Sequence, residues 1–243
     1  MSGALVVIPA RYGSNRLSGK PLLNDTGRPL VVHTLERALQ ADRVTRVVVA
    51  TDDRRILDAV QEHGGTAVMT SSHHRCGTTR VAEVAEQATE EIILNLQGDE
   101  PEVDPDLIDA LIAAARTHPE ADWVTASIPF SRVEDAASPD AVKVVVDSSG
   151  RALYFSRALI PYSSGTDPVL PRLHVGLYAF RREALIRFAR MEPSGLERTE
   201  KLEQLRALEN GMTIHVVDWP EGHVGIDTHD DYRKFVMRCR EGK

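Results

Sequence analysis

The stretch Val6–Leu22, VVIPARYGSNRLSGKPL, shapes the interpretation of the whole first half of the chain. An apolar run opens it, and three cations follow, Arg11, Arg16 and Lys20, among two glycines and two serines and with no acidic residue. The chain as a whole is acidic, with 29 Lys and Arg against 36 Asp and Glu and a net charge of −7. Small residues let backbone N–H groups approach phosphate oxygens, and cations neutralise their charge. We therefore expect a polyphosphate-binding loop after a strand.

The stretch matches neither of two common glycine-rich phosphate motifs. Five residues separate Gly13 from Gly19 where the P-loop has four, and Pro21 replaces the serine or threonine that would hold magnesium. The Rossmann glycine pattern is absent as well. A solvated basic loop is the alternative interpretation, because such loops are common on protein surfaces. Taken alone, these residues leave both interpretations open.

The sequence around this loop alternates short β-branched runs with helical periods. Buried strands are predicted at 5–8, 47–50, 67–69, 92–96 and 124–128. Helices are predicted at 29–41, 54–63 and 105–118, with Asp104 as the N-cap of the last. This alternation predicts an α/β fold, with a mainly parallel twisted sheet that carries helices on both faces in a Rossmann-like arrangement.

The second half of the chain has a different pattern of predicted strands and helices. Strands are predicted at 142–146, 153–155, 175–180 and 214–217, and helices at 182–191, 200–209 and 230–240. Short polar connections indicate antiparallel pairing among the first three of these strands. We interpret 1–243 as a single domain with a small β-rich lobe inserted at about 130–200. Ligands of such sheets bind where the strands end, which here means the loops at 9–21, 97–101 and 225–228.

Composition excludes several classes of function. The acidic balance argues against nucleic-acid binding, which usually needs a basic face. No apolar run approaches the roughly 20 residues that span a bilayer. The two cysteines, Cys76 and Cys239, have no metal-binding spacing and suggest a reducing compartment. A cytoplasmic protein is expected.

Several motifs of the chain carry a family resemblance. The stretch PARYGSNRLSGKPL resembles the N-terminal signature of the sugar-acid cytidylyltransferases, above all those that act on 3-deoxy-manno-octulosonate (Kdo). The resemblance continues in order along nearly the whole chain. It is carried by ATDD (50–53), GTTRVAEV (77–84), NLQGDEP (95–101), DAVKVVVDSSGRALYFSRALIPY (140–162), HVGLYAF (174–180), LEQLRALENG (202–211) and GIDTHDD (225–231).

The resemblance implies a function. A Kdo cytidylyltransferase transfers CMP from CTP to the anomeric hydroxyl of Kdo, which releases pyrophosphate and activates Kdo for lipopolysaccharide synthesis. The family also implies Mg²⁺ as cofactor and a homodimer, with the inserted lobe in sugar binding or dimerisation. The alternatives are another sugar acid, such as an 8-amino Kdo analogue or a nonulosonate, and a nucleotide-binding protein without catalysis.

The resemblance also implies site residues on the nucleotide side. The clamp for the CTP phosphates would consist of Arg11, Gly13, Ser14, Arg16 and Lys20. The cytosine pocket would use Gly77, Thr78 and Arg80. The family pattern there is Ser-Gly-Thr, an acid and Arg, whereas this chain has Cys76 and Thr79 at the first and fourth positions. Cys76 offers only a weak hydrogen-bonding group at the first position, and Thr79 removes a negative charge at the fourth.

Two aspartates are the candidate magnesium ligands. Asp99 directly follows a predicted strand, where a carboxylate beside a phosphate loop can hold Mg²⁺. The resemblance implies that Asp227 shares the ion, and that Lys20, Asp99 and Asp227 are the catalytic residues. The alternative interpretation is structural, with Asp99 as a turn residue before Pro101 and Asp227 as the cap of the final helix. Neither interpretation needs Glu100.

The sugar acid carries a carboxylate and many hydroxyls, so its pocket needs a cation and several polar groups. The resemblance implies that this pocket is formed by Gln97, Arg157, His174, Tyr178, Glu203 and Gln204. His174 and Tyr178 are four residues apart on a predicted strand, so both should face the same side. Arg157 is the expected partner of the carboxylate.

Overall fold

The computed structural model describes residues 3–13, 17–130, 132–162, 170–222 and 225–241. Its strands are β1 (Ala4–Ala10), β2 (Val44–Thr51), β3 (Ala67–Met69), β4 (Ile92–Asn95), β5 (Trp123–Pro129), β6 (Lys143–Val146), β7 (Ala152–Ser156), β8 (Arg172–Arg181) and β9 (Ile214–Asp218). Its α-helices are α1 (Leu30–Ala38), α2 (Arg54–Glu62), α3 (Gly77–Glu86), α4 (Pro105–Thr117), α5 (Arg182–Ala189), α6 (Gly195–Glu200), α7 (Gln204–Glu209) and α8 (His229–Arg240). Two short 3₁₀ segments are η1 (Lys20–Leu22) and η2 (Val133–Ala137). None of these helices is both long and apolar enough to cross a membrane.

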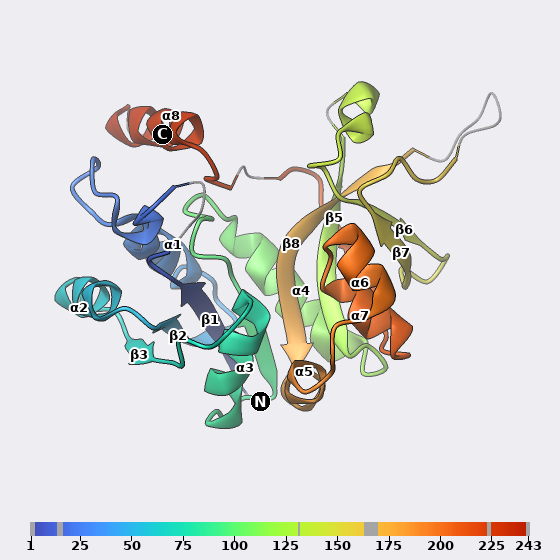
Figure 1. The fold of residues 1–243 in the computed structure, drawn as a ribbon, viewed down its shortest axis with the longest axis horizontal. Coiled ribbons are helices and arrows are strands. Elements are labelled where there is room, and N and C mark those ends of the chain that lie inside the picture. Colours follow the sequence, from blue (N-terminus) through green and yellow to red (C-terminus); the bar gives the residue numbers. More distant parts are fainter. Residues whose placement is uncertain (1–2, 14–16, 131, 163–169, 223–224, 242–243) are drawn as a thin grey trace.

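One sheet joins these nine strands in the order β3-β2-β1-β4-β8-β5-β9, with β6 and β7 attached beside β8 (Figure 1). The first four strands of that order pair in parallel, and so do β5 and β9. In contrast, β8 runs antiparallel to β4 and β5, and β6 is antiparallel to both β7 and β8. The predicted α/β fold, with antiparallel pairing in the second half, is confirmed.

Two apolar layers cover the two faces of the sheet, because successive side chains of a strand point to opposite sides. In β1, Val6 and Ile8 pack in a layer to which α1, α2 and α4 contribute. Leu5 and Val7 pack in the other layer, with side chains from α3, α5 and α7. All four side chains are buried, which is typical of a strand inside a parallel sheet.

The C-terminal helix packs against the opening loop. Tyr232 of α8 is buried in a third apolar cluster together with Leu17 and Ile226. A capping box starts the helix, in which Thr228 accepts from the backbone N–H of Asp231 and the Asp231 carboxylate accepts from that of Thr228. The segment before α8 is thereby held beside the loop that follows β1.

The predicted and observed elements differ most clearly at 200–209. This range was predicted to be one helix, but the structure has the short helices α6 and α7 with Lys201 between them. Lys201 has φ 57° and ψ 45°, a left-handed conformation that ends a right-handed helix. The chain therefore changes direction directly before Glu203. The prediction was wrong there because the apolar pattern continues through a backbone break.

Candidate active site

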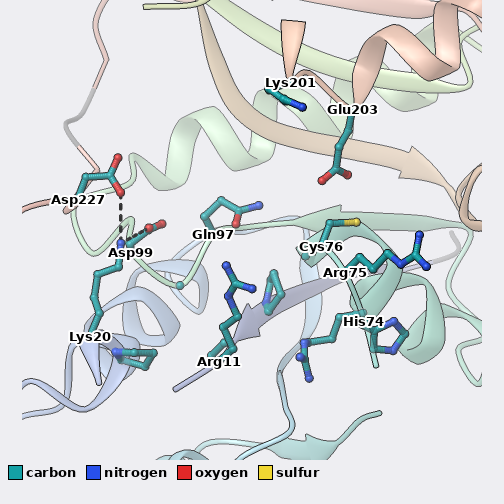
Figure 2. A pocket seen from close by; sticks show the side chains of 16 residues that line it. Arg11, Lys20, His74, Arg75, Cys76, Gln97, Asp99, Lys201, Glu203 and Asp227 are labelled. Atoms are coloured by element: carbon teal, nitrogen blue, oxygen red, sulfur yellow. Dashed lines mark hydrogen bonds and ion pairs between the residues drawn. The ribbon is translucent and has the colours of Figure 1, made fainter. Parts of the chain in front are cut away.

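A cavity of about 650 Å³ opens at the edge of the sheet where β1 and β4 end. All three loops in which we expected ligands to bind contribute to it, and the turn before α3 and the segment between α6 and α7 complete it (Figure 2). The residues that line it are Pro9, Ala10, Arg11, Lys20, Pro21, His74, Arg75, Cys76, Gly77, Arg80, Gln97, Gly98, Asp99, Lys201, Glu203 and Asp227.

The opening loop folds back on itself to present Lys20. Gly19 adopts φ 68°, and its N–H donates to the carbonyl of Tyr12 at 3.0 Å. A side chain at Gly19 would meet the Tyr12 ring at 3.2 Å, so both the conformation and the close approach require glycine. Gly13 is exposed and lies outside the cavity lining, whereas Ser14 and Arg16 fall outside the described residues.

Lys20 joins the three loops. Its Nζ donates to Asp99 Oδ2 at 2.6 Å and to the carbonyl of Ile226 at 2.7 Å, and it lies 3.4 Å from Asp227 Oδ1. The backbone N–H of Ile226 also donates to the Asp99 carbonyl at 2.9 Å. Two carboxylates distant in sequence thus converge on one cation. Because Thr228 caps α8, the Asp227 side chain is not the helix cap.

The turn before α3 brings the backbone close to the end of β1. A Cβ on Gly77 would lie 3.2 Å from Pro9 Cγ, which favours glycine there. One turn later, Arg80 is buried, and its guanidinium donates to Thr70 Oγ1 at 2.6 Å and Asp52 Oδ2 at 2.9 Å. Arg80 therefore lines the cavity with a guanidinium whose orientation is fixed by Thr70 and Asp52. Its predicted neighbour Thr78 is buried and lies outside the lining.

Gln97 lies between Asp99 and Cys76 in the cavity (Figure 2). Its Nε2 donates to Asn95 Oδ1 at 3.2 Å. The Nδ2 atom of Asn95 is buried and has no hydrogen-bond partner in the described structure. An unpaired buried donor costs free energy. Of this pair, Gln97 lines the cavity and can contact a ligand there, whereas Asn95 lies beneath it.

Glu203 enters the cavity from the opposite side (Figure 2). Its Oε2 atom is buried and finds no hydrogen-bond partner in the described part of the chain. Burial raises the pKa of the Cys76 thiol, and the Glu203 carboxylate raises it further. The same two causes raise the pKa of the Tyr178 hydroxyl. Glu203 is therefore a carboxylate beside protonated groups, available to accept hydrogen bonds from a ligand.

His174 and Tyr178 lie on the same side of β8, as predicted, with ring centroids 5.4 Å apart. His174 Nε2 and Thr125 Oγ1 are 3.0 Å apart, and the His174 ring meets Phe155 edge-on at 4.9 Å. Burial lowers the pKa of His174 to about 3, so the imidazole is neutral near neutral pH. Neither His174 nor Tyr178 lines the cavity. Tyr178 is near enough to Glu203 for that carboxylate to raise the pKa of its hydroxyl.

Two other predicted sugar-binding residues lie outside the cavity lining. The Arg157 guanidinium donates to the carbonyls of Glu200 at 2.8 Å and Pro139 at 2.9 Å. Gln204 is buried at the start of α7. Of the six residues expected around the sugar, the described lining includes Gln97 and Glu203.

Comparisons with known proteins identify the family of this chain. The family model described as cytidylyltransferase matches residues 5–214. The 3-deoxy-manno-octulosonate cytidylyltransferase of Trichlorobacter lovleyi is 43% identical, covering 98% of this chain and 99% of its own. The enzyme of the same name from Geobacter sulfurreducens is 44% identical over 96% of this chain and 98% of its own. This chain belongs to the cytidylyltransferase family.

Solved structures of cytidylyltransferases extend the similarity to three dimensions. A CMP:2-keto-3-deoxy-manno-octonic acid synthetase complexed with CTP superposes with a TM-score of 0.95 at 41% identity, and the alignment covers 100% of both chains. A cytidylyltransferase from Leptospira borgpetersenii shares the fold, with a TM-score of 0.65 at 17% identity and with 99% of this chain and 88% of that chain covered. The family resemblance predicted from the motifs is confirmed.

The two departures from the family pattern are part of a local network. His74 Nε2 makes a short contact with Glu83 Oε2, and its Nδ1 is 3.2 Å from Thr79 Oγ1. The Thr79 hydroxyl also donates to the Cys76 carbonyl at 3.1 Å. Thr79 thus acts as a neutral partner for His74, where the expected acid would place a second carboxylate near Glu83.

Three residues that shape the cavity were not predicted from the sequence. Asp52 lies in the ATDD motif and holds Arg80, so its position after a strand was a usable signal. The backbone carbonyls of 74–77 were considered as acceptors for the base, but the side chain of His74 gave no signal. Lys201 gave no signal, because a lysine inside a helical pattern normally lies on a solvated face.

Proposed function

We propose that this protein transfers CMP from CTP to the anomeric hydroxyl of Kdo and releases pyrophosphate. The observation that carries the proposal is the arrangement of Lys20, Asp99 and Asp227 on one side of a cavity that has Glu203 on the other. The first side offers charges for a triphosphate, and the second offers an acceptor for sugar hydroxyls. Relatives similar along nearly their whole length carry the name of this activity.

The phosphates of CTP would lie in the opening loop. Lys20 and Arg11 line the cavity and supply positive charge, and Lys20 can exchange an aspartate contact for a phosphate oxygen. The protein's contribution is to position the attacking hydroxyl and the α-phosphorus in line and to stabilise charge on the phosphate oxygens. Gly13, Ser14 and Arg16 complete the proposed clamp.

Asp99 and Asp227 fit a magnesium ion. Their carboxylates converge on the same point, where Lys20 Nζ now lies 2.6 Å and 3.4 Å from them. The described residues contain no group of three or more His, Cys, Asp or Glu side chains that could bind a metal by themselves. Mg²⁺ typically takes only one or two carboxylates and completes its shell with phosphate oxygens and waters. When bound, the ion would neutralise phosphate charge and lower the pKa of a coordinated hydroxyl.

The cytosine would be bound at the start of α3. Gly77 allows the close approach of the ring, and Arg80 presents a guanidinium whose orientation is fixed by Asp52 and Thr70. A fixed donor can select a base that offers acceptors on the same edge, because a donor left unpaired in a closed site costs binding free energy. Thr78 supports this turn from its buried position.

The sugar would lie between Gln97 and Glu203. Tyr178, His174 and Gln204 would act from behind, through the packing that orients Glu203, and Arg157 would hold the neighbouring segment through Glu200. We also propose that the protein is a cytoplasmic homodimer, as the family resemblance implies.

Pyrophosphate release tests the function. Purified protein with CTP, Mg²⁺ and Kdo should release pyrophosphate together with CMP-Kdo, and CTP without Kdo should give only background. Replacing CTP with UTP, or Kdo with N-acetylneuraminate, should lower the rate by orders of magnitude, since unpaired polar groups discriminate by up to about 10⁴-fold. Binding of CTP without turnover of any sugar acid would contradict the proposal, and preference for a nonulosonate would correct the substrate.

A further inference from the structure

A sugar acid needs a cation that the predicted residue does not provide. Kdo carries its carboxylate on the same carbon as the attacking hydroxyl, so the carboxylate enters a cavity that also holds a triphosphate. Arg157 was the expected partner, but its guanidinium is occupied by two backbone carbonyls and lies outside the cavity lining. A protein cation that lines the cavity is therefore better placed than Arg157 to contact this charge.

Two of the cations that line the cavity already have partners within the protein. Lys20 is held by Asp99 and Asp227, and Arg80 is held by Asp52 and Thr70. The other cations in the lining are Arg11, Arg75 and Lys201. Arg11 lies on the nucleotide side with the opening loop, and the Arg75 guanidinium points away from the other labelled groups of the cavity (Figure 2). Lys201 extends from the wall that also carries Glu203 (Figure 2).

The backbone of Lys201 is held in an unfavourable conformation. Among the described residues, Lys201 is the only one other than glycine with a positive φ, at 57°. Such a conformation costs free energy for a residue with a Cβ and persists where the surrounding structure imposes it, often at functional sites. Here the buried residues on either side of Glu203, Leu202 and Gln204, anchor the chain directly after the break. The break directs this segment over the cavity.

The ammonium group of Lys201 is available to a ligand. It makes no hydrogen bond or ion pair with any other residue that the structure describes. Lys201 also lines an adjoining cavity of about 890 Å³, which shares His74, Arg75, Cys76 and Glu203 with the first. A free cation at the junction of two cavities is a position from which an anion can be contacted while it is bound in the first.

We propose that Lys201 binds the carboxylate of the sugar acid, two residues before the Glu203 side chain that accepts its hydroxyls. This inference rests on the proposed function and adds to it the residue that recognises the acid group. An ammonium at the carboxylate fixes the adjacent anomeric hydroxyl relative to the α-phosphorus. It also reduces the repulsion between the carboxylate and the triphosphate, which is strong at short range in a partly desolvated site.

Matched variants distinguish the effect of the Lys201 charge from the effect of its left-handed backbone conformation. Lys201→Asn removes the charge but tolerates the left-handed conformation, Lys201→Gly favours that conformation, and Lys201→Arg keeps a cation. Lys234→Gln removes an exposed lysine of α8 that lies outside both cavities and serves as the control. We expect the Asn and Gly variants to raise KM for Kdo by roughly 10- to 100-fold, as for loss of a charged hydrogen bond, with KM for CTP within about threefold. The Arg variant should recover most of the loss.

A second substrate identifies the group that Lys201 contacts. With the methyl ester of Kdo, the unaltered protein and Lys201→Asn should have equal KM values, because the ester has no charge to lose. Equal losses with the acid and the ester would overturn the proposal in favour of a structural role, as would an unchanged KM for Kdo in both the Asn and Gly variants. If the unaltered protein neither binds nor converts Kdo, the proposed function and this inference both fail. Normal conversion with an unaffected Lys201→Asn refutes only the inference.

Discussion

The two walls of the cavity are stabilised differently. On the wall that we propose binds the nucleotide (the nucleotide wall), Lys20, Asp99 and Asp227 satisfy one another across three loops. On the wall that we propose binds the sugar (the sugar wall), the Lys201 ammonium and the Glu203 Oε2 atom have no partner among the described residues. One wall is therefore assembled before a ligand arrives, whereas the other has charges that a ligand must complete. Substitutions on the first wall should disturb the arrangement of charges, and substitutions on the second should mainly weaken contacts to the ligand.

The largest expected effect is that of Asp99→Asn. It removes a charge from the point where two carboxylates meet, so kcat should fall by at least about 100-fold, as when a group that stabilises transition-state charge is lost. The free energy of unfolding should change by less than about 1 kcal/mol, because Asp99 is partly exposed and its pair with Lys20 is screened. Turnover assays at saturating Mg²⁺ and urea melts measure the two quantities. Turnover like that of the unaltered protein would show that the nucleotide wall has been misassigned.

Lys20→Ala should weaken CTP binding by roughly 10- to 100-fold, the range expected for loss of a charge-assisted contact. CMP lacks the β- and γ-phosphates, so its Kd should change by no more than about threefold. Calorimetric titration of both nucleotides into the same variant provides an internal control. Equal weakening of CTP and CMP would place Lys20 away from the pyrophosphate.

His174→Gln tests the support behind the sugar wall through pH. The folded-state pKa of His174 is about 3, below the usual 6.5, because burial disfavours the charged ring. Unfolding therefore takes up a proton between these values, and stability falls as pH decreases from about 6.5 towards 3. The contribution has a slope of up to about 1.4 kcal/mol per pH unit. Urea melts across this range should show a flatter profile for the variant, whereas His63→Gln, at an exposed histidine, should leave the profile unchanged. A profile unaltered by His174→Gln would show that His174 is not buried as a neutral group.

The smallest effect is expected for Cys76→Ser, which restores the family's residue between the two walls. Burial and Glu203 raise the pKa of the thiol, so Cys76 is protonated near neutral pH, and a serine hydroxyl keeps a donor of similar size. We expect kcat/KM for both substrates to stay within about threefold. A larger gain with CTP alone would show that the thiol weakens base recognition in this chain.

The nucleotide wall could be predicted because its signals are local. The loops that carry Lys20 and Asp99 follow β1 and β4. Parallel strands bring their carboxyl ends to one edge, so these two loops had to converge. Asp227 was placed there by the family resemblance, and the structure brings it to the same cation.

The sugar wall could not be predicted because it depends on packing between distant segments. Nothing near Arg157 in the sequence indicates that the carbonyls of Glu200 and Pro139 bind it. The pattern through 200–209 is that of a continuous helix, so the left-handed Lys201 carries no signal in the sequence. Burial of His174 depends on Phe155, which belongs to another strand. The orientation of Arg80 likewise depends on a distant residue, because its partner Asp52 is 28 positions away in the sequence.

The central position of β8 has a consequence for how the molecule unfolds. This strand pairs with β4 on one side and β5 on the other, and its first residues also pair with β6 of the β-rich hairpin. Separating the β6–β7 hairpin from β8 would also disturb the pairing of β8 with β4. We therefore expect the hairpin and the parallel part of the sheet to unfold in one cooperative transition. Backbone amides in β6 and in β4 should then exchange with solvent deuterium at closely similar rates under mildly denaturing conditions. A chimeric enzyme that takes β6 and β7 from a distant relative would have to preserve the register of β8 with both β4 and β5.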